Sequence, residues 1–225
     1  MSQNNHFFRI KSADSIVKKI SKTLISNLEQ GEVLWLLSGG SAIDVAVECS
    51  KGLNGANLGN LTISLVDERF GEVGHADSNW NQLLEAGFSL PGANLHPWLD
   101  GGNSSRTASK TSDFFNTALS SSAYKLALVG MGADGHIAGI LPKSPAATSE
   151  QMVVAYHAGD YQRLTLGFSA LMRLDEAFLY ATGENKAGQL ESLAAKNIDP
   201  IIQPAQIIKR LPSWWVYNDR IGEAI

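Results

Sequence analysis

The chain is poor in metal-binding and disulfide-forming residues. Cys49 is the single cysteine among 225 residues, which excludes an intramolecular disulfide and a cysteine-rich metal site. Its place in an apolar helical pattern predicts a core position. The five histidines lie at positions 6, 75, 96, 136 and 157, without the spacing of a metal site. We therefore expect no metal and no other cofactor.

Long hydrophobic runs and an excess of positive charge are also missing. No apolar run reaches the roughly 18 residues that a membrane-spanning helix needs, and the first six residues lack the basic and apolar blocks of a signal peptide. A formal net charge of −4 argues against a nucleic-acid-binding surface. These absences predict a cytoplasmic protein with no membrane or nucleic-acid partner. A small anionic ligand remains compatible, because it needs only a few cations and backbone N–H groups.

Short apolar runs alternate with amphipathic ones along the chain. Apolar residues at helical spacing predict a helix over 12–29, with Ser12 as its N-cap. Strands are predicted at 33–37, 61–66, 126–129, 152–155, 164–168, 177–181 and 214–217, and further helices at 41–51, 77–87, 104–120, 169–174 and 184–196. This alternation indicates a three-layer α/β/α fold, Rossmann-like, around a mostly parallel sheet. No linker or repeat interrupts it, so we expect a single domain over residues 1–225.

The most informative stretch is a glycine-dense loop after the strand at 126–129. Glycine permits backbone angles closed to other residues and lets a ligand approach the main chain. The loop presents Asp134 and His136, so His136 is a candidate base and Asp134 a candidate for orienting it. The alternative is a tight strand-to-helix turn, in which His136 lies on the surface and Asp134 caps the helix.

Polar residues also follow two earlier strands, at the strand ends where α/β proteins bind ligands. The turn Ser38-Gly39-Gly40-Ser41 leads into a helix and offers N–H groups, hydroxyls and a helix dipole to a phosphate. Alternatively, Ser41 only caps that helix. Asp67, Glu68 and Arg69 place three charges at the end of a buried strand, where they must pair or meet a ligand. Arg69 suits a phosphate or carboxylate, and the alternative is an Asp/Arg ion pair in a loop.

In their order, these motifs resemble the 6-phosphogluconolactonase family. The series is Ser-Gly-Gly-Ser at 38–41, Asp-Glu-Arg at 67–69, Ser-Asn at 78–79 and Gly-x-Gly-x-Asp-Gly-His at 130–136. Helix capping alone would explain Ser78 and Asn79. Arg163-Leu-Thr-Leu166 is similar to the family's Arg-x-Thr-Leu strand, and Gly183-Glu-Asn-Lys186-Ala to its Gly-x-x-Lys-Ala segment. The resemblance implies the fold of glucosamine-6-phosphate deaminase and ribose-5-phosphate isomerase.

The resemblance also implies the reaction, hydrolysis of 6-phosphoglucono-1,5-lactone to 6-phosphogluconate in the oxidative pentose phosphate pathway. A lactone is an activated ester, so water can attack C1 with the help of one general base. His136 would take the proton from that water, and Asp134 or Asp67 would fix the imidazole tautomer. Arg69 or N–H groups of the glycine loop would stabilise the oxyanion.

By the same resemblance, the 6-phosphate would rest on the turn at 38–41, with Lys186 and Arg69 as nearby cations. Gly132 and Arg163 would complete the substrate-binding residues. Taken without the family, Lys186 reads equally well as a solvated lysine of a first helical turn, and Arg163 as a brace of its loop. The family commonly has Thr-Pro where this chain has Ala42-Ile43, which removes a hydroxyl that could touch phosphate.

Two further functions are compatible with this sequence. Glucosamine-6-phosphate deaminases/isomerases share the Gly-x-Asp-Gly-His motif but usually continue to Asn-Glu-Pro, whose glutamate helps to open the sugar ring. Here Ile140 and Leu141 precede Pro142, which favours the lactonase. The other alternative is a non-catalytic sugar-phosphate-binding module. For all three functions the ligand is a small phosphorylated sugar compound, and for the lactonase it is the lactone. We expect the protein to be a monomer or a small homo-oligomer.

Overall fold

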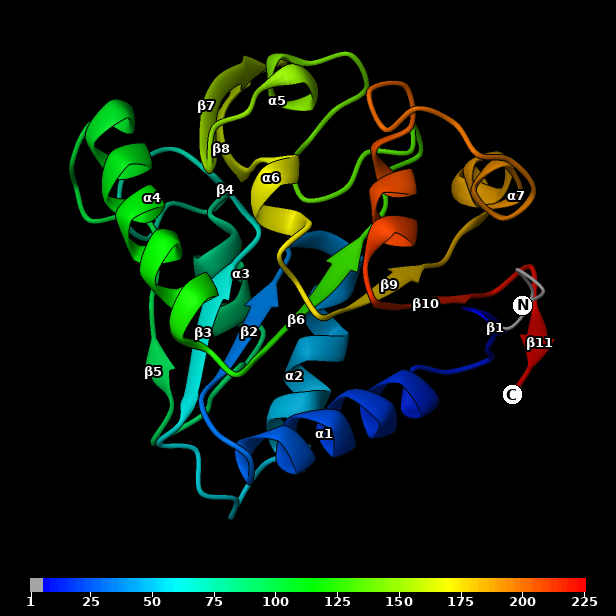
Figure 1. Ribbon diagram of the computed structural model, residues 1–225, viewed down its shortest axis with the longest axis horizontal. Coiled ribbons are helices and arrows are strands. Elements are labelled where there is room, and N and C mark those ends of the chain that lie inside the picture. The colour runs from blue at the N-terminus through cyan, green and yellow to red at the C-terminus, as the bar shows by residue number, and fades with distance from the viewer. Residues whose placement is uncertain (1–5) are drawn as a thin grey trace.

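An eight-stranded parallel sheet forms the centre of the protein, a computed structural model that describes residues 6–225 (Figure 1). Its strands run in the order β11 (Glu223–Ala224), β1 (Phe7–Arg9), β10 (Ser213–Asn218), β9 (Glu176–Ala181), β6 (Tyr124–Gly130), β2 (Val33–Leu37), β3 (Leu61–Leu65) and β5 (Asn94–Leu95). Strand β2 is buried along its whole length, as expected of a parallel strand covered on both faces. The absence of a signal peptide was expected mainly from residues 1–5, which lie outside the described part.

Helices cover both faces of the sheet, which confirms the predicted α/β fold. On one face α1 (Asp14–Leu28) packs against α2 (Ile43–Gly52), and α2 against α3 (Asn79–Glu85). The other face carries α4 (Ser104–Ser121), α6 (Phe168–Leu171) and the 3-10 helix η4 (Pro204–Arg210) (Figure 1). Right-handed crossovers explain this division, because the chain first winds toward β5 and then returns toward β1. Among residues 6–225, no helix is both long enough and apolar enough to span a bilayer.

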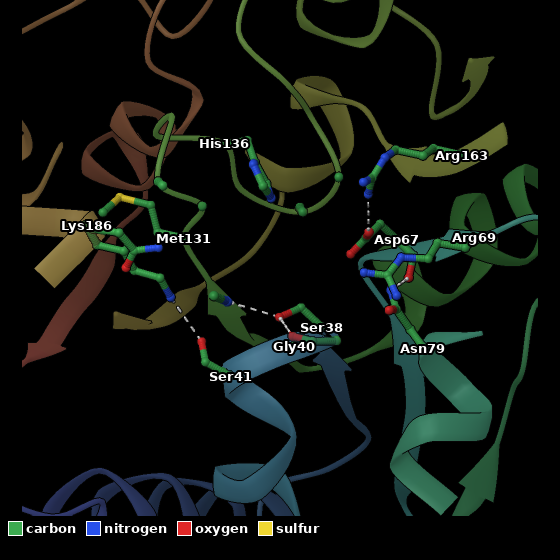
Figure 2. A pocket seen from close by; sticks show the side chains of 17 residues that line it. Ser38, Gly40, Ser41, Asp67, Arg69, Asn79, Met131, His136, Arg163 and Lys186 are labelled. Atoms are coloured by element: carbon green, nitrogen blue, oxygen red, sulfur yellow. Dashed lines mark hydrogen bonds and ion pairs between the residues drawn. The ribbon is translucent and has the colours of Figure 1, made fainter. Parts of the chain in front are cut away.

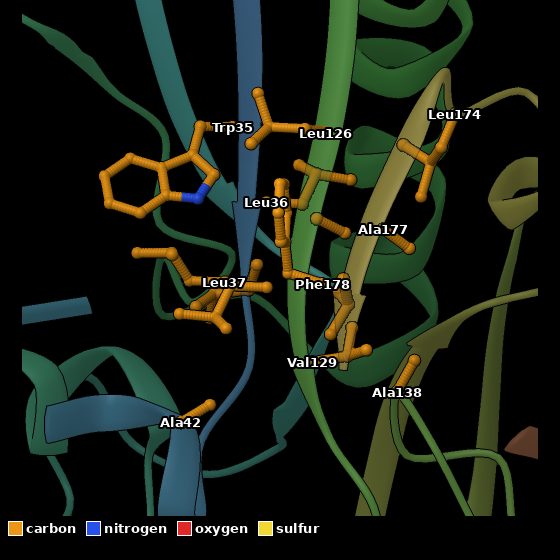
Figure 3. Packing of buried hydrophobic residues seen from close by; sticks show 14 of the residues in the cluster. Trp35, Leu36, Leu37, Ala42, Leu126, Val129, Ala138, Leu174, Ala177 and Phe178 are labelled. Carbon is orange, nitrogen blue, oxygen red and sulfur yellow. The ribbon is translucent and has the colours of Figure 1, made fainter. Parts of the chain in front are cut away.

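The core fills the two layers between sheet and helices. Figure 3 shows Trp35, Leu36 and Leu37 of β2 packed beside the side chains of β6, and Phe178 of β9 among them. Trp35 and Phe178 have no exposed surface. Cys49 is fully buried in α2 as predicted, and burial raises the pKa of its thiol to about 12.

A second, antiparallel sheet corrects one expectation. The apolar runs predicted as strands at 152–155 and 164–168 do not join the parallel sheet. They form β7 (Val153–Ala158) and β8 (Tyr161–Leu166), which pair in the order β4-β8-β7 with β4 (Asp67–Arg69). Only Gly159 and Asp160 separate β7 from β8, and Gly159 has a φ of 59°. A two-residue turn makes a hairpin, whereas a parallel pair needs a crossover of a dozen residues or more.

Two predicted helix features are wrong. The first helix begins at Asp14, and its N-cap is Ala13 rather than Ser12. Ser12 lies one residue earlier, where its Oγ accepts the Asp14 N–H at 3.4 Å and donates to the Asp14 carboxylate at 2.8 Å. The helix predicted at 169–174 is reduced to the single turn of α6, because the chain has to reach Glu176 to start β9 in register with β6 and β10.

The topology brings four strand ends together. Strands β9, β6, β2 and β3 are consecutive in the sheet and parallel, so their carboxyl ends meet at one edge. After β2 the chain leaves toward the face of α2, and after β6 it leaves toward the opposite face. Such a reversal between neighbouring strands opens a crevice, and this is where open α/β sheets bind ligands.

Candidate active site

Loops at this edge of the sheet line a cavity of about 310 Å³ (Figure 2). The lining residues are Ser38, Gly39, Gly40, Ser41, Asp67, Arg69, Asn79, Gly130, Met131, Gly132, Ala133, His136, Ala138, Gly139, Arg163, Asn185 and Lys186. The structure therefore brings together, around one space, every site residue predicted from the sequence except Asp134. That residue lies just outside and touches the cavity through His136.

His136 and Asp134 form a hydrogen-bonded pair. Asp134 Oδ1 lies 2.7 Å from Nδ1 of His136 and also accepts the backbone N–H of His136 at 3.1 Å. Burial pushes the pKa of Asp134 upward, but this backbone N–H and the imidazole outweigh it and hold the pKa below its usual value. The alternative of a helix cap is wrong, because the next helix, α5 (Pro145–Thr148), begins eleven residues after Asp134. Figure 2 shows the His136 ring reaching into the cavity.

Gly132 is required by the packing of the His136 ring. A Cβ at this position would collide with the imidazole and approach Asp134 Oδ1 to 2.8 Å.

Two hydroxyl groups of the hairpin β7-β8 hold the loop beyond the histidine. Ala138 has a left-handed φ of 51°, and its carbonyl accepts the hydroxyl of Thr165. The carbonyl of Gly139 accepts the Tyr156 hydroxyl at 2.5 Å. Both bonds fix the loop that carries the histidine.

Asp67 is the buried carboxylate of the cavity, with 6% of its surface exposed. Burial raises its pKa, although the charges of Arg163, His136 and Arg69 oppose the shift. The nearest cationic atom is Arg163 Nη1, 3.9 Å from Asp67 Oδ2. Of the two carboxylates considered for His136, Asp134 makes the hydrogen bond, and Asp67 makes none with the ring.

Asn79 is a cavity residue that the sequence reasoning missed. It was assigned to helix capping, but the N-cap of α3 is Ser78, whose Oγ accepts the N–H of Asn81 at 3.1 Å. The Asn79 side chain instead points to the strand ends, and its Nδ2 donates to the Asp67 carbonyl at 2.9 Å. Its Oδ1 is buried and has no hydrogen-bond partner within residues 6–225. Its place in the Ser-Asn pair that opens the helix after the charged strand end was the available signal.

Glu68, the third charge at the end of the buried strand, is satisfied by hydrogen bonds within the protein. Its carboxylate accepts four hydrogen bonds, from the N–H groups of Arg69 (2.7 Å), Asn79 (2.6 Å) and Trp80 (3.1 Å) and from the Ser78 hydroxyl (2.9 Å). These include free N–H groups at the start of α3, which a helix cannot satisfy by itself. Burial raises the pKa of Glu68 in spite of these donors. Glu68 thus anchors α3, and with it Asn79, to the end of β3.

The Ser-Gly-Gly-Ser turn closes the opposite wall. Its helical segment begins at Gly40, with Gly39 at the N-cap, so Ser41 is not the cap. Ser41 Oγ instead lies 3.2 Å from Lys186 Nζ, which donates to it. Lys186 is half-buried at the cavity and is not merely a solvated surface residue. This burial lowers the pKa of Lys186, and Asp219 opposes the shift. Ser38 Oγ accepts the N–H of Gly130 at 3.0 Å and joins the ends of β2 and β6.

The cavity is suited to an anionic ligand. Lys186, Arg69 and Arg163 contribute three cations to its lining, against one carboxylate from Asp67. In Figure 2 Lys186 and Ser41 lie on one side, and the two arginines lie on the other beside Asp67. Nδ1 of His136 is hydrogen-bonded to Asp134, and the ring reaches into the cavity. His136 can therefore exchange a proton with a molecule bound there.

A model of the family described as glucosamine-6-phosphate isomerases/6-phosphogluconolactonase matches residues 9–215. The chain belongs to this family. A 6-phosphogluconolactonase of Helicobacter pylori strain J99 is 31% identical over 159 residues, which cover 65% of this chain and 66% of the relative. One of Caulobacter vibrioides is 30% identical over 165 residues, with 67% of each chain covered. The chain thus spans about two thirds of the length of these curated relatives.

Solved structures of the family share the fold. The 6-phosphogluconolactonase of Thermotoga maritima superposes with a TM-score of 0.79 at 22% identity and covers 94% of this chain and 99% of its own. A monomeric glucosamine-6-phosphate deaminase gives a TM-score of 0.76 at 16% identity, with 94% and 97% covered. Because both kinds of enzyme superpose with similar TM-scores, the fold of the family does not separate the two reactions.

Proposed function

We propose that this protein is a 6-phosphogluconolactonase, which hydrolyses 6-phosphoglucono-1,5-lactone to 6-phosphogluconate. The observation that carries the proposal is the His136 ring, held by Asp134 on one nitrogen and reaching into a cavity with three cations. The curated relatives with this name support it. Hydrolysis of an activated ester requires a base, donors for an oxyanion and a grip on the phosphate, and the cavity offers residues for each.

In the proposed mechanism His136 is the general base. Asp134 accepts the hydrogen on Nδ1, which leaves the Nε2 lone pair free for a proton. Nε2 takes a proton from water as the water oxygen bonds to C1. The tetrahedral intermediate then collapses, the bond from C1 to the ring oxygen breaks, and the imidazolium returns the proton to that oxygen. The low pKa of Asp134 keeps this residue ionised and able to stabilise the imidazolium.

The cations are assigned by their place in the cavity. The phosphate rests on the turn at 38–41, where N–H groups at the start of the helical segment and the Lys186 ammonium meet. Arg69 and Arg163 face the negative charge that develops on the oxyanion at C1. Asn79 lines the same cavity and holds the Asp67 carbonyl through its Nδ2.

Leu141 argues against the deaminase reaction. In the deaminase motif a glutamate stands before the proline, whereas Leu141 here packs against the core, and its N–H donates to the Tyr156 hydroxyl at 3.3 Å. The described cavity lining contains no glutamate. The second candidate function therefore lacks the carboxylate that would assist His136 in ring opening.

The decisive experiment measures proton release from freshly generated 6-phosphogluconolactone and from the unphosphorylated lactone. Spontaneous hydrolysis is subtracted, and we expect an enzyme-dependent rate that strongly favours the phosphorylated substrate. Lys186→Met should remove much of that preference, whereas Lys196→Met, at the exposed end of the same helical segment, should keep it. Equal rates on both lactones would contradict the phosphate site. Ammonia release from glucosamine 6-phosphate would favour the deaminase. Binding of the phosphorylated lactone without turnover would favour a non-catalytic module.

We further propose that the protein acts in the cytoplasm as a monomer or a small homo-oligomer, without a nucleic-acid partner. One buried cysteine is compatible with a reducing compartment. The net charge of −4 disfavours a polyanionic partner. Light scattering of the purified protein tests the oligomeric state, its location after cell fractionation tests the compartment, and a gel-shift assay with DNA and RNA tests the absence of a nucleic-acid partner.

A further inference from the structure

Tyr161 lies beside both arginines of the cavity, although it belongs to none of the motifs found in the sequence. The Cζ atom of Arg69 is 5.3 Å from the centre of the Tyr161 ring, and that of Arg163 is 5.8 Å away. Both distances are within the range of a cation–π interaction. One half-buried ring thus contacts two guanidinium groups at once.

Strand register explains this arrangement. Arg69 of β4 pairs directly with Arg163 of β8, so their side chains leave the small sheet on the same face. Tyr161 precedes Arg163 by two residues on β8 and therefore also lies on that face. The turn that begins after Ala158 sets where β8 starts, and so places the ring at the edge of the arginine pair.

The arginine pair needs such a neighbour. Two like charges directly opposite each other in a sheet repel, and the Nε atoms of both arginines are buried without a partner in the described chain. Asp67 compensates from one side, at 3.9 Å from Arg163. On the other side, the Asp77 carbonyl accepts Arg69 Nη1 at 3.1 Å, and Asp77 Oδ1 lies 3.5 Å from the Tyr161 hydroxyl.

We propose that Tyr161 is a positioning residue that holds Arg69 and Arg163 together and directed at the anionic groups of the substrate. The negative face of the ring offsets the repulsion between the two guanidiniums and restricts the rotamers of both side chains. Tyr161 does not line the cavity, so it acts through the arginines and does not touch the substrate. This inference rests on the proposed lactonase function, because it specifies how two of the cations of that site are held.

The test compares variants of the ring by kcat/KM on 6-phosphogluconolactone. Tyr161→Leu should lower kcat/KM about tenfold, the order expected for two lost cation–π contacts. Tyr161→Phe keeps the ring and should stay within about twofold of the parent. His157→Leu, exposed on the same hairpin, is the matched control and should change nothing. An unchanged Tyr161→Leu enzyme, or a Tyr161→Phe enzyme as poor as Tyr161→Leu, would overturn the proposal.

A double-mutant cycle separates positioning from a general structural role. In a background with Arg69→Ala and Arg163→Ala, Tyr161→Leu should have little further effect on kcat/KM, because the groups through which it acts are gone. A full tenfold loss in that background would overturn the proposal. Tyr161→Gln provides a second variant if Tyr161→Leu fails to fold, and thermal unfolding identifies that case.

Failure of the lactonase assignment is distinguishable from failure of this inference. If the parent protein shows no lactonase turnover, the proposed function fails. The role of Tyr161 is then decided by titration calorimetry with 6-phosphogluconate, which presents the phosphate and, at C1, a carboxylate in place of the oxyanion. In that measurement Tyr161→Leu should raise the Kd about tenfold, Tyr161→Phe should leave it unchanged, and equal Kd values for the parent and Tyr161→Leu would overturn the inference.

Discussion

At the scale of single residues, His136 owes its position to two small neighbours. Asp134 occupies Nδ1 of the ring, and Gly132 leaves the space in which the ring lies. Both lie within four residues of the histidine, so the local sequence could predict them as a unit. Tyr161 could not be predicted in this way, because it reaches the site through strand pairing that no local pattern shows. Asn79 comes from another helix, where only its place in the Ser-Asn pair signals it.

His136→Ala should lower kcat by about 10² to 10⁴, the usual contribution of a positioned general base. The matched control is His157→Ala, a histidine exposed on β7 outside the cavity, which should retain full activity. Proton release under substrate saturation measures both. Parent-like turnover in His136→Ala would rule out this histidine as the base.

Gly132→Ala should reduce kcat strongly, because a Cβ at this position displaces the His136 imidazole from its bond with Asp134. Gly188→Ala in α7 (Ala187–Ala195) is the matched control. Its Cβ would meet nothing within 4 Å, and replacing a helical glycine should stabilise the fold by about 0.5–1 kcal/mol. Activity and urea unfolding of both variants check this. Equal activities would mean that the ring tolerates the extra methyl group.

Asp67 and Asp134 should affect the pH dependence of stability with opposite signs. The folded-state pKa of Asp67 is raised, so its contribution to stability is lost as the pH rises through that pKa, and Asp67→Asn should be more stable than the parent at pH 7. This advantage should vanish below the ordinary pKa of about 3.9.

The folded-state pKa of Asp134 is lowered, so its contribution is present above the ordinary pKa and is lost as the pH falls through the folded value. Asp134→Asn should therefore be less stable than the parent at pH 7. Urea unfolding of both variants between about pH 3 and pH 8 tests the pair. The same sign at pH 7 would contradict the assigned causes.

At the scale of elements, the connection from β3 through β4 to α3 decides the right-hand wall of the cavity in Figure 2. The sequence indicated three charges at the end of a buried strand but not which of them line the cavity and which one binds the following helix. Asp67 and Arg69 line the cavity, whereas Glu68 points to α3 because successive side chains of a strand alternate in direction.

Glu68→Ala should destabilise the protein by about 3 kcal/mol, because several buried donors at the start of α3 lose their acceptor together. Glu72→Ala, exposed in the following loop, should change the free energy of unfolding by less than about 0.5 kcal/mol. Urea denaturation measures both. A small effect of Glu68→Ala would show that water replaces the carboxylate.

The hairpin β7-β8 was the main error at this scale. Its two apolar runs were correctly recognised as strands, but apolar composition does not distinguish a parallel strand from an antiparallel one buried under a helix. The turn Gly159-Asp160 carried the information, since a two-residue connection permits only antiparallel pairing. The helix bounds, by contrast, followed closely from apolar spacing, as in α2 and α4.

At the scale of the whole molecule, a ligand in the cavity bridges loops from four strands and should stabilise the fold. At about 100 times its Kd, 6-phosphogluconate should raise the free energy of unfolding by about 2.7 kcal/mol through mass action. Lys186→Met should require a higher concentration for the same effect, and Lys196→Met should behave like the parent. Thermal unfolding over a ligand series measures this. A Tm independent of ligand would contradict binding at this site.

The sequence by itself determined the α/β class, the family and the residues around the cavity, because strand ends in a parallel sheet converge wherever strands and helices alternate. Its absences also limited the function classes from the start, and the single domain over 1–225 stays a prediction. Only the tertiary structure decided that Asp134 holds the imidazole, that Glu68 anchors α3, and that Asn79 and Tyr161 join the site. Those roles depend on strand register and on contacts between residues far apart in the chain, which local patterns of polarity do not encode.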